Sequence, residues 1–166
     1  MPVSSGKAKV TLPTDDQILI EREFDAPRHL VYKALTTPEL VRRWFHANRG
    51  VVKEAEIDLR VGGKWRYVSE ADSDGEFGFH GEYRELVPNE RIVWTEFYEG
   101  VPEGVAEADA TNVNTATLTE ADGRTNLTLL IQAPSKAARD AIIDSGMEAG
   151  MQDAYDLLEE VARSLR

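Results

Sequence analysis

The chain contains no cysteine, so disulfide bonds, thiolate metal sites and cysteine nucleophiles are all excluded. It also has no apolar run that approaches the roughly 18 residues of a membrane-spanning helix. Its first 16 residues lack the apolar core of a secretory signal peptide. We therefore expect a cytoplasmic protein that has no membrane partner.

Basic residues are scarce in this chain. It has 19 Lys and Arg against 30 Asp and Glu, which gives a formal net charge of −11. Nucleic acid is excluded as a partner, because binding it requires a basic face that displaces counterions. The length of 166 residues is enough for one self-sufficient core. We expect a flexible tail over residues 1–16 and a single domain over residues 17–166.

Catalytic signatures are missing as well. The sequence has no G-x-S-x-G, no glycine-rich phosphate loop and no H-E-x-x-H motif. Its three histidines, His29, His46 and His80, lack the spacing of metal ligands. No metal site and no cofactor are expected.

Alternating apolar and polar residues predict a series of antiparallel strands. Asp122-Gly123 lies between two such runs and is a strong hairpin signal. The acidic stretch 99–112 is rich in small residues, which predicts a mobile loop that gates a binding site. The predicted strands are residues 17–24, 53–60, 64–69, 77–87, 91–98, 113–120 and 124–132.

Helices are predicted after the first strand and at the end of the chain. Asp25 is expected to cap a first short helix, and Thr37, followed by Pro38, a second. The last helix should run from about Ser135 to Leu165, with a break at Ser145-Gly146. Gly150 costs this helix about 1 kcal/mol relative to alanine, which indicates either close packing or room for a ligand.

Aromatic and methionine side chains are predicted to converge between the sheet and the last helix. Side-chain parity along the strands places several aromatic residues on one face. Such stripes often form ordinary core, and that alternative stays open here. The candidate ligand-binding residues are Trp44, His46, Trp65, Tyr67, Phe79, Tyr83, Trp94, Glu96, Met147, Met151 and Tyr155.

Two carboxylates, Glu85 and Glu96, are expected on the same inward faces. A buried carboxylate must be paired or must hold its proton. Each glutamate could bond a nearby tyrosine or arginine in a structural role. Alternatively, it could be a recognition group, or an acid or base with a raised pKa, in an apolar pocket. For His46, a capping role at the end of the second helix is the alternative to ligand binding.

Three motifs resemble those of a known family. They are REFDAPRHLVYKALTTPELVRRWF, from Arg22 to Phe45, the run Gly62-Gly63-Lys64-Trp65, and a hairpin that starts at Gly81. Their order resembles the family named for the activator of the ninety-kilodalton heat-shock protein ATPase. That family is part of the START-like, or SRPBCC, helix-grip superfamily.

The resemblance implies an α+β fold. Its curved antiparallel sheet of about seven strands wraps a long C-terminal helix, and two short helices follow the first strand. The chain departs from the family pattern at two positions. His46 follows Trp44-Phe45, and Met151 stands where the family often has tryptophan. Both positions would border the cavity, so we expect a cavity with its own shape.

The resemblance leaves three functions open. The first is a binding domain that holds a small apolar or aromatic molecule between sheet and helix. The second is a chaperone-interaction module like the namesake. The third is a cofactor-free cyclase, hydrolase or dehydratase that uses Glu96, His46 or Tyr83. Binding rather than catalysis is the leading expectation, and a homodimer is left open.

Overall fold

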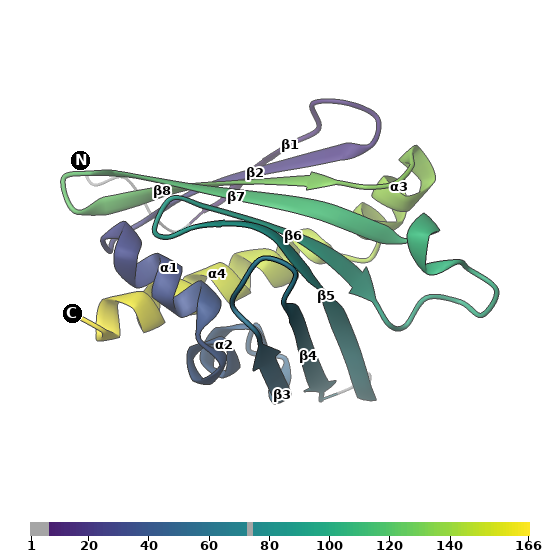
Figure 1. The fold of residues 1–166 in the computed structure, drawn as a ribbon, viewed down its shortest axis with the longest axis horizontal. Coiled ribbons are helices and arrows are strands. Elements are labelled where there is room, and N and C mark those ends of the chain that lie inside the picture. The colour runs from purple at the N-terminus through teal and green to yellow at the C-terminus, as the bar shows by residue number, and fades with distance from the viewer. Residues whose placement is uncertain (1–6, 73–74) are drawn as a thin grey trace.

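The computed structural model describes residues 7–72 and 75–166, and in these ranges one antiparallel sheet carries four α-helices (Figure 1). The sheet has eight strands there, in the order β1-β2-β8-β7-β6-β5-β4-β3. The strands are β1 (Lys9–Thr11), β2 (Gln17–Phe24), β3 (Gly50–Ile57), β4 (Lys64–Ala71), β5 (Gly75–Val87), β6 (Arg91–Tyr98), β7 (Thr111–Ala121) and β8 (Arg124–Gln132).

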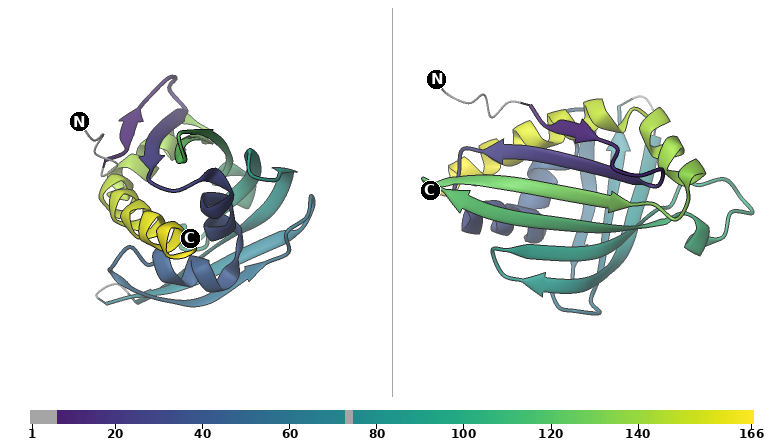
Figure 2. Two further views of the ribbon diagram at one scale, coloured as in Figure 1. Left: turned by 90° about the vertical axis from the view of Figure 1, so that its left-hand side faces the viewer. Right: turned by 90° about the horizontal axis from the view of Figure 1, so that it is seen from above.

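The helices lie on the concave side of this sheet, which curves around α4 (Figure 2). α1 and α2 pack against α4. The helices are α1 (Arg28–Thr36), α2 (Pro38–Trp44), α3 (Lys136–Asp144) and α4 (Met147–Ser164), and a short 3₁₀ helix, η1 (Glu107–Asp109), lies between β6 and β7. The expected helix-grip architecture is confirmed, with one strand more than the resemblance implied.

The additional strand lies inside the segment that the sequence predicted as a flexible tail. Lys9–Thr11 pairs with the edge of β2. The backbone of Ala8 exchanges two hydrogen bonds with the Gln152 side chain of α4, both of 2.9 Å. The free backbone groups of an edge strand are a template for such pairing. Residues 1–6 of the predicted tail lie outside the described residues.

The predicted cap of the first helix is wrong. α1 begins at Arg28 with Pro27 as its cap residue, and no side chain caps it. The backbone N–H of Asp25 instead donates to Glu159 Oε2 of α4 at 2.6 Å. Thr37 does occupy the cap position of α2 before Pro38, but its side chain accepts no hydrogen bond.

The break in the C-terminal helix is where the sequence placed it. Gly146 separates α3 from α4 with a φ of 82°, a left-handed conformation that glycine adopts without strain. Ser135 Oγ accepts from the backbone N–H of Ala138 at 3.0 Å and caps α3. The break turns the chain so that α4 runs along the sheet (Figure 1).

A fully buried arginine, absent from the sequence predictions, joins β2 to α4. Arg22 shares the inward row of β2 with Ile20 and Phe24. Its guanidinium forms ion pairs of 3.0 Å with Asp156 and 3.0 Å with Glu159, and lies 4.9 Å from the Phe24 ring centroid. These contacts satisfy a charge that would otherwise be costly to bury.

Candidate functional site

The concave face of the sheet gathers aromatic side chains from three elements. The rings of Trp65 and Tyr67 on β4 are 4.7 Å apart, centroid to centroid. Phe45, just after α2, lies 5.0 Å from Tyr67 and 5.7 Å from Phe79 of β5. Phe45 thus links the helices to the sheet. The candidate set omitted it, although its place beside Trp44 was a signal.

The predicted ligand-binding residues divide into two groups by burial. Two of the buried ones have structural hydrogen bonds: the indole N–H groups of Trp44 and Trp65 donate to the carbonyls of Ala34 (2.9 Å) and Thr95 (3.1 Å). The buried group is Trp44, Trp65, Tyr67, Tyr83 and Tyr155, and the half-buried group is His46, Phe79, Trp94, Glu96, Met147 and Met151. The half-buried apolar members lie against the hydrophobic core without being covered by it.

His46 has a local contact. Its Nδ1 accepts a hydrogen bond of 3.0 Å from the backbone N–H of Asn48, in the turn that follows α2. Ala47 and Asn48 in this turn have φ angles of 54° and 60°. This contact is consistent with a structural role of His46 at the end of α2.

Glu96, on β6, forms a hydrogen bond to β7 on the concave side. Its Oε1 accepts from Asn114 Nδ2 of β7 at 3.2 Å. Burial raises the pKa of Glu96, while hydrogen bonds with Trp94 and Asn114 oppose this rise. The pKa of the Tyr155 hydroxyl on α4 is raised, mainly by burial and next by the Glu96 carboxyl. The pKa of the Tyr67 hydroxyl on β4 is also raised, mainly by burial, then by Tyr83 and then by Glu96.

Asn114 is a site residue that the sequence analysis missed. It is 3% exposed, and its Oδ1 has no hydrogen-bond partner among the described residues. Ala116 and Leu118 follow it on the same inward row of β7. A polar residue at the head of an apolar inward row was the signal that could have identified it.

Glu85 does not join Glu96, so this part of the predicted site is wrong. A register shift between Tyr83 and Glu85 in the β5–β6 pairing reverses the side-chain alternation of β5. Glu85 is consequently exposed and forms an ion pair of 2.7 Å with Arg91. Of the two glutamates, Glu96 alone lies on the concave face.

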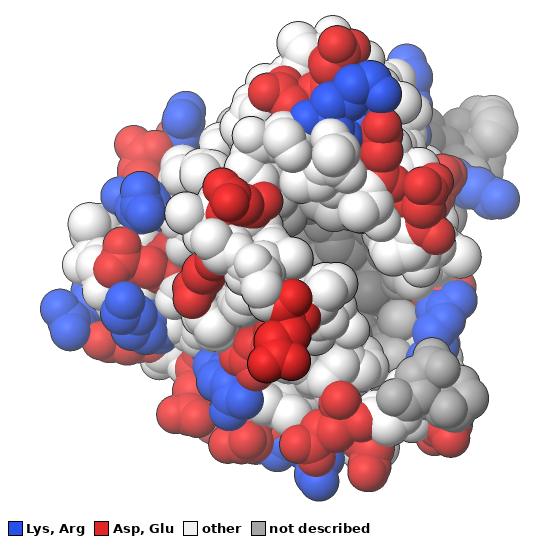
Figure 3. Space-filling view, turned by 90° about the vertical axis from the view of Figure 1, so that its right-hand side faces the viewer, with Lys and Arg blue, Asp and Glu red and all other residues white. Residues whose placement is uncertain are grey.

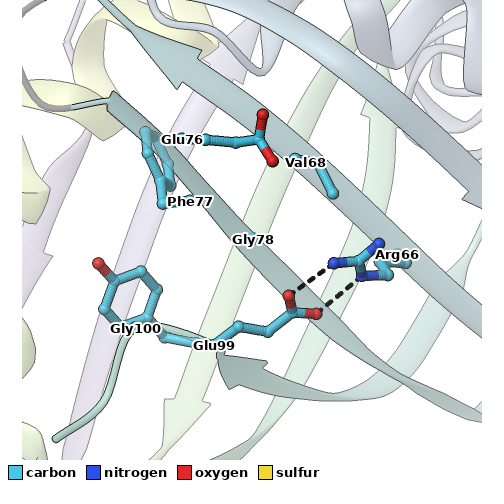
Figure 4. Close-up of a pocket in the computed structure, with 8 residues that line it drawn as sticks. Arg66, Val68, Glu76, Phe77, Gly78, Glu99 and Gly100 are labelled. Atoms are coloured by element: carbon cyan, nitrogen blue, oxygen red, sulfur yellow. Dashed lines mark hydrogen bonds and ion pairs between the residues drawn. The ribbon is translucent and has the colours of Figure 1, made fainter.

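Two cavities lie outside the concave face, and none of the predicted residues lines either of them. One, of about 400 Å³, is bordered by Glu160, Arg163, Ser164 and Arg166 at the end of α4. The other, of about 250 Å³, lies at β4, β5 and the end of β6 (Figure 4). In it Arg66 donates to both carboxylate oxygens of Glu99, at 2.9 and 2.8 Å.

Glu99 also takes part in holding the β6–β7 loop to the outside of the sheet. His80 Nδ1 lies 2.7 Å from Glu99 Oε2, and its Nε2 lies 3.1 Å from Glu107 Oε2 in η1. The hydrogen bond from Arg66 lowers the pKa of Glu99 to about 2. For His80, partial burial lowers the pKa and the two carboxylates raise it, with a net rise. The loop is shorter than predicted, because β7 already begins at Thr111.

The end of the molecule that carries α3 and the β6–β7 loop is hollowed near its centre (Figure 3). Asp and Glu side chains border this hollow. The space next to α4 is open at one further point, because a Cβ built on Gly150 would meet no atom within 4 Å. Close packing therefore does not explain this glycine.

Comparisons with known proteins agree with this architecture. The sequence profile of the family described as Activator of Hsp90 ATPase homolog 1-like protein matches residues 25–163. No curated protein matches the chain. No helix in the described ranges is long and apolar enough to cross a membrane.

Several solved structures share the fold. A protein from Rhodobacter sphaeroides has a TM-score of 0.84 at 24% identity, over 96% of this chain and 100% of that one. A Nitrosomonas europaea protein has a TM-score of 0.80 at 22% identity, over 92% and 97%. A Chromobacterium violaceum protein has a TM-score of 0.72 at 28% identity, over 87% and 96%. The first two likenesses, at such low identity, show the fold alone.

Proposed function

The chain belongs to the family described as Activator of Hsp90 ATPase homolog 1-like protein, and we propose that it binds a small apolar or aromatic molecule between the sheet and α4. Family and fold support a ligand-binding helix-grip domain. A ligand in this place would contact β5, β6 and the first turns of α4. The proposal does not require a catalytic residue or a cofactor.

The observation that carries the proposal is the half-buried apolar group on the concave side. Phe79, Trp94, Met147 and Met151 lie against the core, yet each keeps part of its surface exposed. Covering such surface is favourable by about 25 cal/mol for each Å² removed from water. Methionine side chains adapt readily to ligands of different shape. An apolar ligand would bury the surface of these side chains that the protein alone leaves exposed.

The β6–β7 loop is the gate in this proposal. Its 3₁₀ turn is held to the sheet by the contact between His80 and Glu107. It lies at the hollowed end of the molecule (Figures 1 and 3). Releasing this 3₁₀ turn from His80 would break an exposed contact, which is a small cost, while Glu99 at the start of the loop stays paired with Arg66.

An enzyme is the second candidate, and one observation favours it. The pKa of Glu96 is raised by burial, and buried acids of this kind serve as proton donors in many active sites. Tyr67 and Tyr155 lie close enough for their hydroxyl pKa values to respond to its charge. A cofactor-free hydrolase or cyclase would use Glu96 as its acid.

Native mass spectrometry of freshly purified protein tests the binding function. We expect a bound apolar molecule that the Met151→Trp variant loses, because the larger ring would fill part of the space. Met147→Leu, which conserves volume and apolarity on the same helix face, is the control and should retain the molecule. If Met151→Trp loses several kcal/mol of stability and neither the native protein nor this variant carries a ligand, Met151 is part of the close-packed core. The account would then move toward a protein partner such as a chaperone.

A further inference from the structure

We propose that the ligand of the concave face is an uncharged apolar molecule with a hydroxyl head group, which Asn114 and Glu96 hold together. The inference rests on the proposed binding function and adds the chemical class of the ligand. It follows from the hydrogen-bonding capacity that the pair leaves unused.

Asn114 provides an unused acceptor. Its side chain is on the inward row of β7, where it pairs with Trp94 on one side and Ile131 on the other. One side-chain atom, Nδ2, donates to Glu96, but Oδ1 is buried and without a partner among the described residues. A buried acceptor without a donor costs stability, so such an atom in a folded protein calls for an explanation. A ligand donor would be that explanation.

Glu96 provides the complementary donor. Its Oε1 is engaged with Asn114, whereas no Lys, Arg or His in residues 7–72 and 75–166 neutralises the carboxylate. Burial without a cation favours the protonated acid, whose O–H can donate. Glu96 is half-buried, so a ligand would approach the pair from its side and would have to shift the atoms that cover Asn114 Oδ1. An acceptor next to a donor matches a hydroxyl group, which both donates and accepts.

A carboxylate head group does not match this site. Both buried arginines of the described residues are already engaged: Arg22 pairs with Asp156 and Glu159, and Arg139 pairs with Asp140. Of the two, Arg22 lies on the inward row of β2. Its Nε donates to the carbonyl of Glu23 at 3.2 Å, so it has little capacity left for a ligand. An anionic head group would lie beside Glu96 with no free cation to balance it. Fatty acids are therefore excluded by this arrangement.

Equilibrium dialysis with three probes that share one ring system tests the inference on the native protein. The probes are naphthalene, 2-naphthol and 2-naphthoate. We expect 2-naphthol to bind about tenfold more tightly than naphthalene, the worth of one good hydrogen bond. We expect 2-naphthoate to bind more weakly than naphthalene.

Variants locate the effect. Asn114→Leu should remove the advantage of 2-naphthol over naphthalene. Thr115→Val, one residue further on the same strand and on the outer face, should change neither affinity. Because Asn114→Leu could disturb folding, the ranking of the three probes on the native protein is decisive by itself.

The outcomes separate the two claims. If naphthalene and 2-naphthol bind equally, or if 2-naphthoate binds as tightly as 2-naphthol, the head-group inference is overturned while binding in the concave face stands. If none of the three probes binds, both are overturned.

Discussion

Replacing Glu96 with glutamine should stabilise the protein at neutral pH. Glutamine has the same shape and keeps the oxygen that accepts from Asn114 Nδ2 at 3.2 Å. It removes only the ionisation that burial makes unfavourable. Single stabilising substitutions commonly gain about 0.5–2 kcal/mol. For a chain of this size, a gain of about 1 kcal/mol raises the melting temperature by about 2–4 °C.

The pH dependence of this gain follows from the direction of the shift. The folded-state pKa of Glu96 lies above its ordinary value of 4.5, so ionisation destabilises the folded protein above that value. Glu96→Gln should therefore be more stable than the parent at about pH 7. The difference should disappear at about pH 4, where Glu96 holds its proton in both the folded and unfolded states.

Glu85→Gln is the matched control, on the neighbouring strand. Glu85 is exposed and pairs with Arg91 at 2.7 Å, so its loss should cost between about 0 and 1 kcal/mol at neutral pH. Urea unfolding of the three proteins at both pH values measures all these differences. A Glu96→Gln protein that is less stable than the parent at about pH 7, or whose gain is the same at both pH values, would refute the reasoning.

Three further predictions concern α4, the loop and the buried arginine. Gly150→Ala should stabilise α4 by about 0.5–1 kcal/mol, measured by urea unfolding, because the new methyl group meets no atom within 4 Å. Weaker naphthalene binding by the same variant would place the ligand next to Gly150. The folded-state pKa of His80 is raised, so its ion pair with Glu107 weakens as the pH rises through that value. Amide exchange, corrected for its intrinsic rate, should show the β6–β7 loop better protected at about pH 6 than at about pH 8.5. Equal protection at both pH values would argue against the contact. Arg22→Met should lower the free energy of unfolding, measured in urea, by about 3 kcal/mol, because Arg22 is fully buried. Asp156→Asn should lower it by less than about 1 kcal/mol, because Asp156 is exposed. Equal losses would contradict this role of Arg22.

The order of elements could be predicted from the sequence because it depends on local patterns. Strands β2, β6 and β8 have the predicted bounds, since alternation and turn residues set them. The break at Gly146 follows from the conformational freedom of glycine. β1 could not be predicted, because its pairing depends on a free strand edge rather than on its own residues.

The arrangement of side chains on the concave face could be predicted only in part. Side-chain parity correctly placed Tyr67 of β4 and Phe79 of β5 on one face, where both rings pack against Phe45. It failed at Glu85, because a bulge reverses the alternation and no residue type specifies it. Asn114 and Arg22 were missed for a different reason. Their roles arise from partners far away in the sequence, on β6 and α4.

Methyl NMR of the two helix methionines tests binding in the concave face most directly. Met147 and Met151 are half-buried members of the proposed site, and the variants Met147→Leu and Met151→Leu assign their two signals among the ¹³C-methyl signals of the three methionines. Titration with naphthalene should shift both signals along a saturating curve, with the same dissociation constant as equilibrium dialysis. Saturable binding by dialysis with neither methionine signal shifted would place the ligand elsewhere and contradict the account.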